Sequence, residues 1–248
     1  MTEDEKISSL EEFTKRVLEE YTIWNTKHFP WFRGEPESNQ PLLPRLYREG
    51  HNEDQLLQNF RIKAPALGDV PPRSEHTEQW LFLAQHIRLP TRLLDWTESA
   101  LVALYFALQT KEPVVWMLNP IALNCLSEPD SSLEEIIPNF FPLPWVKGIV
   151  NENIKGAWQK DQHGVDFPVA VPPTCVHPRM IAQKSCFTIW GKKKDSLSTL
   201  VDDRVLKKFE INGSGRKDML FKLRILGISE LSVFPDFEGL ARDLEKLF

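Results

Sequence analysis

The sequence predicts an α+β fold, in which helices flank a mixed, largely antiparallel sheet. Two observations predict it. Some segments repeat apolar residues with the helical period of about 3.6, whereas others are short β-branched or aromatic runs between turn residues. The two kinds of segment do not alternate regularly, which disfavours a parallel sheet built from βαβ units. The 248 residues contain no internal repeat, so we expect one domain over residues 1–248.

The expected helices are the segments with helical periodicity. They cover about residues 6–28, 53–61, 74–86, 217–226 and 239–247. The expected strands cover residues 31–36, 114–118, 169–171, 205–211 and 231–234, with one or two more within residues 179–190. Prolines make residues 42–47 extended or turn-like, and we expect a loop-rich, proline-punctuated insertion at about residues 120–168.

Residues 83–108 hold the densest group of polar candidates, followed by the most apolar segment of the chain. The apolar part, residues 100–108, is far shorter than the roughly 20 residues of a membrane span, so it predicts a helix buried in a globular core. Asp95, with Glu98 three residues later, predicts a capping box at the start of this central helix. The N–H groups of its first turn would favour an anionic ligand such as a phosphate.

Composition narrows the class of protein. The net charge of −5 disfavours binding to nucleic acid or membrane over the whole surface. Three cysteines without a CxxC pair predict free thiols, and hence a reducing compartment. No apolar run is long enough to span a bilayer and the N-terminus is acidic, so we expect a cytoplasmic protein with no membrane partner. No His/Cys spacing suits zinc, so no metal site is expected.

The charged candidates have a binding and a structural interpretation. Arg33 could bind a dinucleotide phosphate through its planar guanidinium, or it could tie a turn to Asp95 or Glu98. Arg92 could also contact such a dinucleotide, or it could form an internal ion pair with Asp95 that fixes the loop between them.

The remaining candidates are equally ambiguous. His86 could bind substrate or relay a proton, but a histidine at a helix C-terminus is also favoured by the helix dipole. Trp96 could stack on a nicotinamide or pack in the core. Thr97 could contact the substrate, and Gln183 is a candidate for the same site.

Several motifs together resemble the FRG domain, a family named after the Phe-Arg-Gly that stands here at residues 32–34. The most specific of them is QHxxLPTRLLDWT at residues 85–97. The others are WFRG at 31–34, LxPxL at 42–46, ALxFA at 103–107, PRxxxQxxxF at 178–187 and FPDxxGLA at 234–241. The resemblance covers about residues 20–247, and Cys186 departs from it because the family usually has a glycine there.

More distantly, the layout is similar to the ADP-ribosyltransferase fold. That similarity implies a first strand supplying an arginine, a threonine before an Ala-Phe-Ala-type helix, and a late strand supplying a catalytic glutamate. Arg33, Thr97 and Gln183 stand at these places. Gln183 cannot act as a general base, although it could hydrogen-bond a ribose hydroxyl. Asp95 or Glu98 could then supply the carboxylate.

The resemblance implies a cleft that binds a nucleotide, with NAD as the expected substrate. The protein would transfer ADP-ribose to an unidentified protein or nucleic-acid acceptor, or cleave NAD, as a bacterial or phage-borne toxin or defence effector. The expected catalytic residues are Arg33, Thr97, Gln183 and His86, and the expected cofactor-binding residues are Arg33, Arg92, Asp95, Trp96 and Thr97. The alternative is a non-catalytic module that senses a nucleotide or a protein partner through the same cleft.

Overall fold

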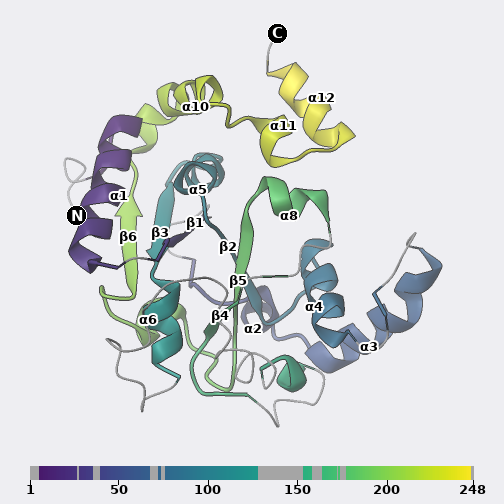
Figure 1. The fold of residues 1–248 in the computed structure, drawn as a ribbon. Coiled ribbons are helices and arrows are strands. Elements are labelled where there is room, and N and C mark those ends of the chain that lie inside the picture. Colours follow the sequence, from purple (N-terminus) through teal and green to yellow (C-terminus); the bar gives the residue numbers. More distant parts are fainter. Residues whose placement is uncertain are drawn as a thin grey trace.

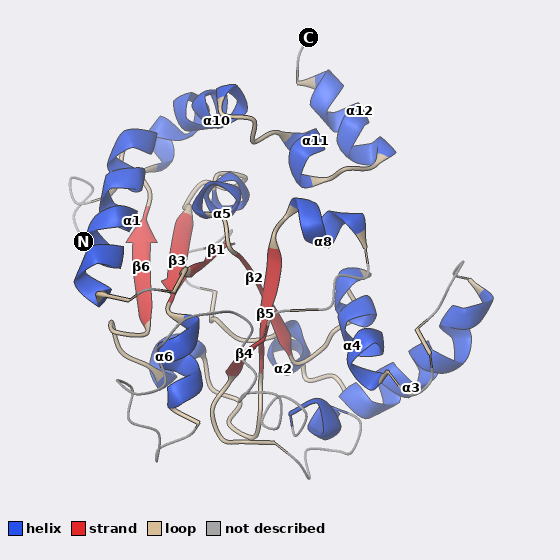
Figure 2. Ribbon diagram, in the orientation of Figure 1, coloured by secondary structure: helices blue, strands red, loops and turns tan. Residues whose placement is uncertain are grey.

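The computed structural model of the chain describes residues 6–26, 28–35, 40–67, 72–73, 76–127, 153–157, 164–171, 173 and 177–246. Its centre is a six-stranded sheet in the order β4-β5-β2-β1-β3-β6. The strands are β1 (Trp31–Glu35), β2 (Leu93–Thr97), β3 (Val114–Leu118), β4 (Val169–Val171), β5 (Ser185–Ile189) and β6 (Leu206–Glu210). All neighbouring strands run antiparallel (Figure 2), which confirms the predicted α+β class.

Helices surround this sheet (Figure 1). They are α1 (Leu10–Trp24), α2 (Arg45–Glu49), α3 (Glu53–Lys63), α4 (Thr77–His86), α5 (Ala100–Ala107), α6 (Pro120–Cys125), α8 (Pro178–Ala182), α9 (Leu197–Leu200), α10 (Arg216–Ile225), α11 (Glu230–Val233) and α12 (Phe237–Glu245). The predicted helices at the N-terminus, at residues 53–61 and before Gly227 are therefore present.

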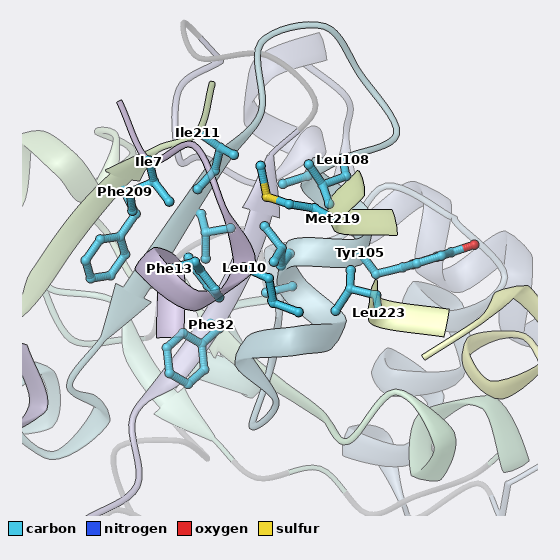
Figure 3. Close-up of a cluster of buried hydrophobic side chains, with 14 of the residues drawn as sticks. Ile7, Leu10, Phe13, Phe32, Tyr105, Leu108, Phe209, Ile211, Met219 and Leu223 are labelled. Atoms are coloured by element: carbon cyan, nitrogen blue, oxygen red, sulfur yellow. The ribbon is translucent and has the colours of Figure 1, made fainter. Parts of the chain in front are cut away.

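One face of the sheet carries two separate helical layers. Helices α1, α5 and α10 pack over β1, β3 and β6, where Phe13, Phe32 and Leu108 are buried in a common apolar cluster (Figure 3). Helices α3 and α4 pack over β2, β4 and β5 around Leu81 and Phe187. Paired residues of antiparallel strands project to the same side, and Phe32 pairs with Thr97 while Asp95 pairs with Phe187. The two layers thus share one face and leave the middle of the sheet between them.

The opposite face of the sheet has its own core. Trp31, Leu94, Trp96 and Cys186 point to this side, where α2, α6 and α9 contribute apolar side chains. Strand alternation therefore divides β2 between two environments. Leu94 and Trp96 belong to this core, whereas Leu93, Asp95 and Thr97 face the two helical layers.

Gly34 sets how closely α5 lies on β1. A Cβ atom at this position would stand 2.0 Å from the carbonyl oxygen of Ala103 and 2.6 Å from the backbone nitrogen of Ala107. Both atoms belong to the backbone of α5, so no rotation of a side chain could relieve the contact. Glycine is therefore the residue that this strand–helix contact requires.

The predicted capping box at Asp95 and Glu98 is wrong. Asp95 lies in the middle of β2, which pairs with β5 along its full length. The helix begins later, with Ser99 as the N-cap, and the Ser99 side chain accepts a hydrogen bond from the backbone N–H of Val102. Pairing with a distant strand decides the conformation here, although Asp95 suits a helix cap by its local preference.

Three further segments differ from expectation. Residues 45–49 form α2 directly after Pro44, residues 178–182 form α8, and residues 230–233 form α11 rather than a strand. A capping box between Ser229 and Ser232 starts α11. These helices are only four or five residues long, too short for a helical period to stand out in the sequence.

Other expectations are met in part or lie outside the described residues. Most of the expected insertion at 120–168 and Cys175 are not among the described residues, and α6 occupies the start of that segment. Cys186 is a buried free thiol, as predicted, and Cys125 is buried as well. Among the described residues, no helix has the length and apolar character needed to cross a bilayer.

Candidate functional site

A cleft of about 310 Å³ lies on the sheet face between the two helical layers. Its floor comes from β1, β2 and β5, and its walls come from the end of α4, from α5, from α8 and from Phe234 after α11. The lining residues are Phe32, Arg33, Gly34, Gln85, His86, Arg88, Asp95, Trp96, Thr97, Phe106, Arg179, Met180, Gln183, Ser185, Phe187 and Phe234. Residues from distant parts of the chain thus meet in a volume typical of small-molecule sites, which is about 300–1,000 Å³.

Arg33 lies where β1 and β2 separate. These two strands pair only at Phe32 and Thr97. Beyond that point, Nη1 of Arg33 donates a hydrogen bond of 2.7 Å to the main-chain oxygen of Asp95, and Nε donates to a carboxylate oxygen of Glu35. Burial alone would lower the pKa of Arg33, but the charges of Glu35 and Asp95 outweigh it and raise the pKa. Arg33 therefore ties β1 to β2; it lines the cleft, and 16% of its side chain is accessible.

Asp95 presents the cleft with a carboxylate. Its side chain is 58% exposed, and Oδ2 lies 3.9 Å from Nη1 of Arg33. The same oxygen accepts a hydrogen bond of 2.9 Å from the side-chain amide of Gln85, whose own oxygen accepts from Thr91. Because Thr91 and Gln85 orient it, the carboxylate is held in place while remaining accessible to a ligand.

Thr97 ends β2 at the edge of the cleft and is 5% exposed. Its hydroxyl oxygen accepts a hydrogen bond of 3.0 Å from the backbone N–H of Ser99, which stabilises the turn into α5. A hydroxyl also has one hydrogen to donate. No acceptor for that hydrogen is recorded within the described part of the chain, so it is available to a ligand.

His86 stacks on another histidine. The rings of His86 and His177 lie 4.0 Å apart between centroids, and Nδ1 of His177 accepts a hydrogen bond from the backbone N–H of Arg179. Burial first, and then the charges of His177 and Arg179, lower the pKa of His86 to about 4. His86 is thus neutral at pH 7, so it carries no positive charge that the helix dipole could stabilise at the C-terminal end of α4.

Gln183 reaches the cleft from the C-terminal end of α8, two residues before β5 begins. Its side-chain nitrogen donates a hydrogen bond of 3.2 Å to the main-chain oxygen of Val233. This contact joins α8 to α11 behind the cleft. The amide oxygen faces no donor recorded among the described residues, and it could accept from a ligand hydroxyl.

Two cations of the cleft are not among the predicted catalytic or cofactor-binding residues. Arg88 follows α4 in a left-handed conformation, with φ of 65°. The backbone N–H groups of Arg88 and Leu89 bond to the carbonyls of Gln85 and Ala84, which is a Schellman motif with arginine at the position that glycine usually takes. This conformation costs a non-glycine residue about 1–2 kcal/mol. Only the QHxR run could have drawn attention to it.

The second unpredicted cation is Arg179, on α8. Its Nη2 pairs with a carboxylate oxygen of Asp236 at 2.5 Å, and its guanidinium carbon lies 5.2 Å from the centre of the Phe234 ring. Its Nε is buried and has no hydrogen-bond partner in the part of the chain that the structure describes. Its position in the cleft depends on α8, a helix that the sequence pattern did not reveal.

Two predicted cofactor ligands point elsewhere. The indole of Trp96 is 3% exposed within the core of the opposite face, and its N–H donates to the hydroxyl of Thr188 at 2.9 Å. Trp96 therefore packs in the core and does not offer its ring to the cleft. Arg92 is 1% exposed, does not line the cleft, and forms its ion pair with Glu53 at 2.8 Å rather than with Asp95.

The chemistry of the cleft is that of a site for an organic anion. Arg33, Arg88 and Arg179 supply positive charge, and Phe106 and Phe234 supply aromatic surface. Asp95 gives the one carboxylate among the lining residues. No group of three or more potential metal ligands occurs among the described residues. The arrangement suits a ligand with negative groups and a planar ring.

Comparison with known proteins identifies one family. No curated protein and no solved structure matches the chain. The family model described as "FRG domain" matches residues 28–114, a segment that contains β1, α4, β2 and α5 and therefore much of the cleft. Residues 28–114 are therefore similar to the FRG domain, which supports the resemblance of this chain to the FRG family.

Proposed function

We propose that the cleft binds NAD and that the protein breaks the bond between nicotinamide and ribose. One observation carries the proposal. Arg33, Asp95, Thr97 and Gln183 come from β1, β2 and the end of α8, yet all line one cleft between the two helical layers. A carboxylate, a hydroxyl, an amide and a guanidinium in one site can bind ribose hydroxyls and a developing positive charge.

The chemistry requires little covalent participation from the protein. The bond between C1′ of the ribose and the nicotinamide nitrogen breaks, and nicotinamide leaves with the electron pair. The resulting cationic ribose is attacked by water or by a protein or nucleic-acid acceptor, whose proton is released. ADP-ribose, or its adduct with the acceptor, is the second product. The carboxylate of Asp95 stabilises the positive charge that develops on the ribose ring.

The other residues position the substrate. Thr97 and Arg33 bind hydroxyls of the nicotinamide ribose next to Asp95, and the partly buried rings of Phe106 and Phe234 offer aromatic surface to the nicotinamide. Gln183 supplies an amide for a further hydroxyl. His86 is neutral and, with a pKa of about 4, too weakly basic to remove a proton efficiently at pH 7, so its role is to accept or donate a hydrogen bond. An enzyme of this kind would act as a toxin or a defence effector by consuming NAD or by modifying a macromolecule.

One feature favours a second candidate function, the binding of NAD without turnover. Gln183 has no ionisable group, and its amide already bonds to the main chain of α11. A ligand that contacted this amide would also affect the hydrogen bond that joins α8 to α11. Such a protein would report the presence of a nucleotide to a partner instead of consuming it.

The deciding experiment uses the full chain, labelled NAD and two matched variants. Asp95→Asn removes the charge of an exposed carboxylate in the cleft, whereas Glu98→Gln makes the same change at an exposed acid that does not line it. Nicotinamide release is measured with the protein alone and with cell extract. We expect Asp95→Asn to lower the rate by about 10²-fold or more, and Glu98→Gln to leave it unchanged.

The other outcomes are equally informative. If NAD raises the midpoint of thermal unfolding but no nicotinamide is released, the protein binds without turnover and the second candidate is correct. If nicotinamide is released equally by Asp95→Asn, the role assigned to this carboxylate is wrong. If NAD is neither consumed nor bound, both candidate functions fail.

A further inference from the structure

A second cavity continues from the cleft. It has a volume of about 430 Å³ and shares Arg88, Phe106, Arg179 and Phe234 with the cleft. Its other lining residues are Tyr105, Gln109, Glu230, Glu238 and Arg242. The two hollows therefore form one elongated site, divided at the ring of Phe234. A ligand longer than one nucleoside could occupy both parts.

The second cavity gathers positive charge from separate parts of the chain. The guanidinium carbons of Arg179 on α8 and Arg242 on α12 lie 5.2 Å and 5.3 Å from the centre of the Phe234 ring. The same ring stands edge-on to Phe106, with centroids 5.9 Å apart. Phe234 therefore holds two arginines at the junction of the two hollows.

The principal acid in this cavity is already neutralised by its neighbours. The Glu230 carboxylate accepts hydrogen bonds from Arg242 at 2.9 Å, from Lys246 at 2.7 Å and from the hydroxyl of Tyr105. Burial by itself would raise the pKa of Glu230, but these contacts outweigh burial and lower the pKa. The positive charge of the other arginines is thus not cancelled by Glu230.

Arg88 is the cation that remains in surplus. Within the part of the chain that the structure describes, its guanidinium has no hydrogen bond and no ion pair, although it lines both hollows. Its backbone has the left-handed conformation, with φ of 65°, in which glycine is the favoured residue. An arginine that lines both hollows and has no partner in the described fold is available to bind a ligand.

We propose that the second cavity is a phosphate subsite, and that Arg88 and Arg179 bind the diphosphate of a dinucleotide whose nicotinamide half occupies the cleft. Guanidinium groups bind phosphate oxygens through paired N–H donors, and the guanidinium of Arg88 offers such donors without a partner in the described chain. The identity of the dinucleotide rests on the proposed function. Recognition of phosphate rests on the arginines alone.

The chain offers a matched pair of variants to test this subsite. Lys184 stands at the corresponding position after α8, also left-handed with φ of 46°, and it lines neither hollow. Arg88→Gly and Lys184→Gly therefore relieve the same kind of backbone strain, but only the first removes a cation from the site. Three probes separate the parts of the ligand: NAD, ADP, which lacks nicotinamide, and nicotinamide riboside, which lacks phosphate.

We expect both variants to unfold at a higher temperature than the unsubstituted protein. Arg88→Gly should weaken the binding of NAD and ADP at least tenfold, measured by calorimetry, and should leave nicotinamide riboside unaffected. Lys184→Gly should bind all three as before. A gain in stability combined with a loss of phosphate affinity cannot arise if Arg88 serves only the fold.

The possible failures can be told apart. If Arg88→Gly binds NAD and ADP as tightly as the unsubstituted protein, the phosphate subsite is refuted while NAD binding stands. If the unsubstituted protein binds ADP but not NAD, and Arg88→Gly loses ADP, the subsite stands and the proposed function falls. If none of the three probes binds, both are refuted.

Discussion

Gly34→Ala tests the contact between strand β1 and helix α5 on which the cleft depends. The added Cβ atom would lie 2.0 Å from the carbonyl oxygen of Ala103. An ordinary contact begins at 3.4 Å, so α5 would have to retreat by about 1.4 Å. A gap of about 1 Å already removes a quarter to a half of the dispersion attraction between packed atoms. Leu104 and Tyr105 are among the buried residues of α5 that would lose such contacts.

The expected cost is larger than that of ordinary overpacking. Overpacking that side chains can relieve costs about 1–3 kcal/mol. Here the contact is between backbone atoms, so we expect Gly34→Ala to lower the free energy of unfolding by about 3–4 kcal/mol. For a chain of this size, that corresponds to a fall of about 10 °C in the unfolding midpoint. Since Phe106 of α5 lines both hollows, ligand affinity should fall as well.

A second glycine supplies the control. Gly50 has a positive φ of 69° and nothing within 4 Å of the added Cβ, so Gly50→Ala changes the backbone preference without a steric contact. It should cost only about 1–2 kcal/mol. Both variants can be compared by urea denaturation and by thermal unfolding. A loss below about 1 kcal/mol for Gly34→Ala would refute the argument that the glycine is required by helix packing.

Two further predictions concern charges in the fold. Arg92→Met removes the guanidinium that pairs with the buried Glu53 and should cost about 3–5 kcal/mol in urea denaturation. The double variant Arg92→Met/Glu53→Gln should be clearly more stable than Arg92→Met, and equal stability would show that the pair does not act as a unit. The pKa of His86 is 6.5 in the unfolded reference and about 4 in the fold, so the folded state disfavours protonation. The contribution of neutral His86 to the free energy of unfolding should be fully present above pH 6.5 and be lost as the pH falls towards 4. His86→Gln should therefore reduce the dependence of the free energy of unfolding on pH in this range. An unchanged dependence would assign the acid sensitivity to other groups.

The sequence predicted the local elements well where periodicity was strong. Residues 114–118 and 169–171 form the predicted strands, and the N-terminal helix and the helix before Gly227 are present. In each case local preference and burial pattern agree, so no distant contact is needed to decide between alternatives. In the short helices α8 and α11 the burial pattern does not support one local structure over another. One turn of helix and a short strand bury similar numbers of apolar residues.

The predicted capping box placed the start of a helix at Asp95, but residues 93–97 form β2. Alternation along this strand puts the side chains of Asp95 and Trp96 on opposite faces, so Asp95 is exposed at the cleft while Trp96 is buried in the core. Arg92 was assigned to the nearest acid along the chain. Its partner, Glu53, lies 39 positions away, and only the tertiary structure brings it close.

The convergence of Arg33, Thr97 and Gln183 could be inferred from the sequence only through a resemblance between families. No period or spacing links β1 to the end of α8. The position of Arg88 could not be predicted from local sequence preference either, because its left-handed conformation belongs to a helix ending that arginine does not favour.

The three residues Phe32, Arg33 and Gly34 serve different parts of the structure because they alternate along one strand. Phe32 is buried under α1 and α5, and Gly34 on the same face allows α5 to approach. Arg33 leaves the strand on the opposite side, but its guanidinium bridges the gap where β1 leaves β2 and there lines the cleft. The packing of α5 and the position of the Asp95 main chain are therefore set by neighbouring residues of one strand. A change at Gly34 should alter the cleft through the helix, whereas a change at Arg33 should alter it through the strand that carries Asp95.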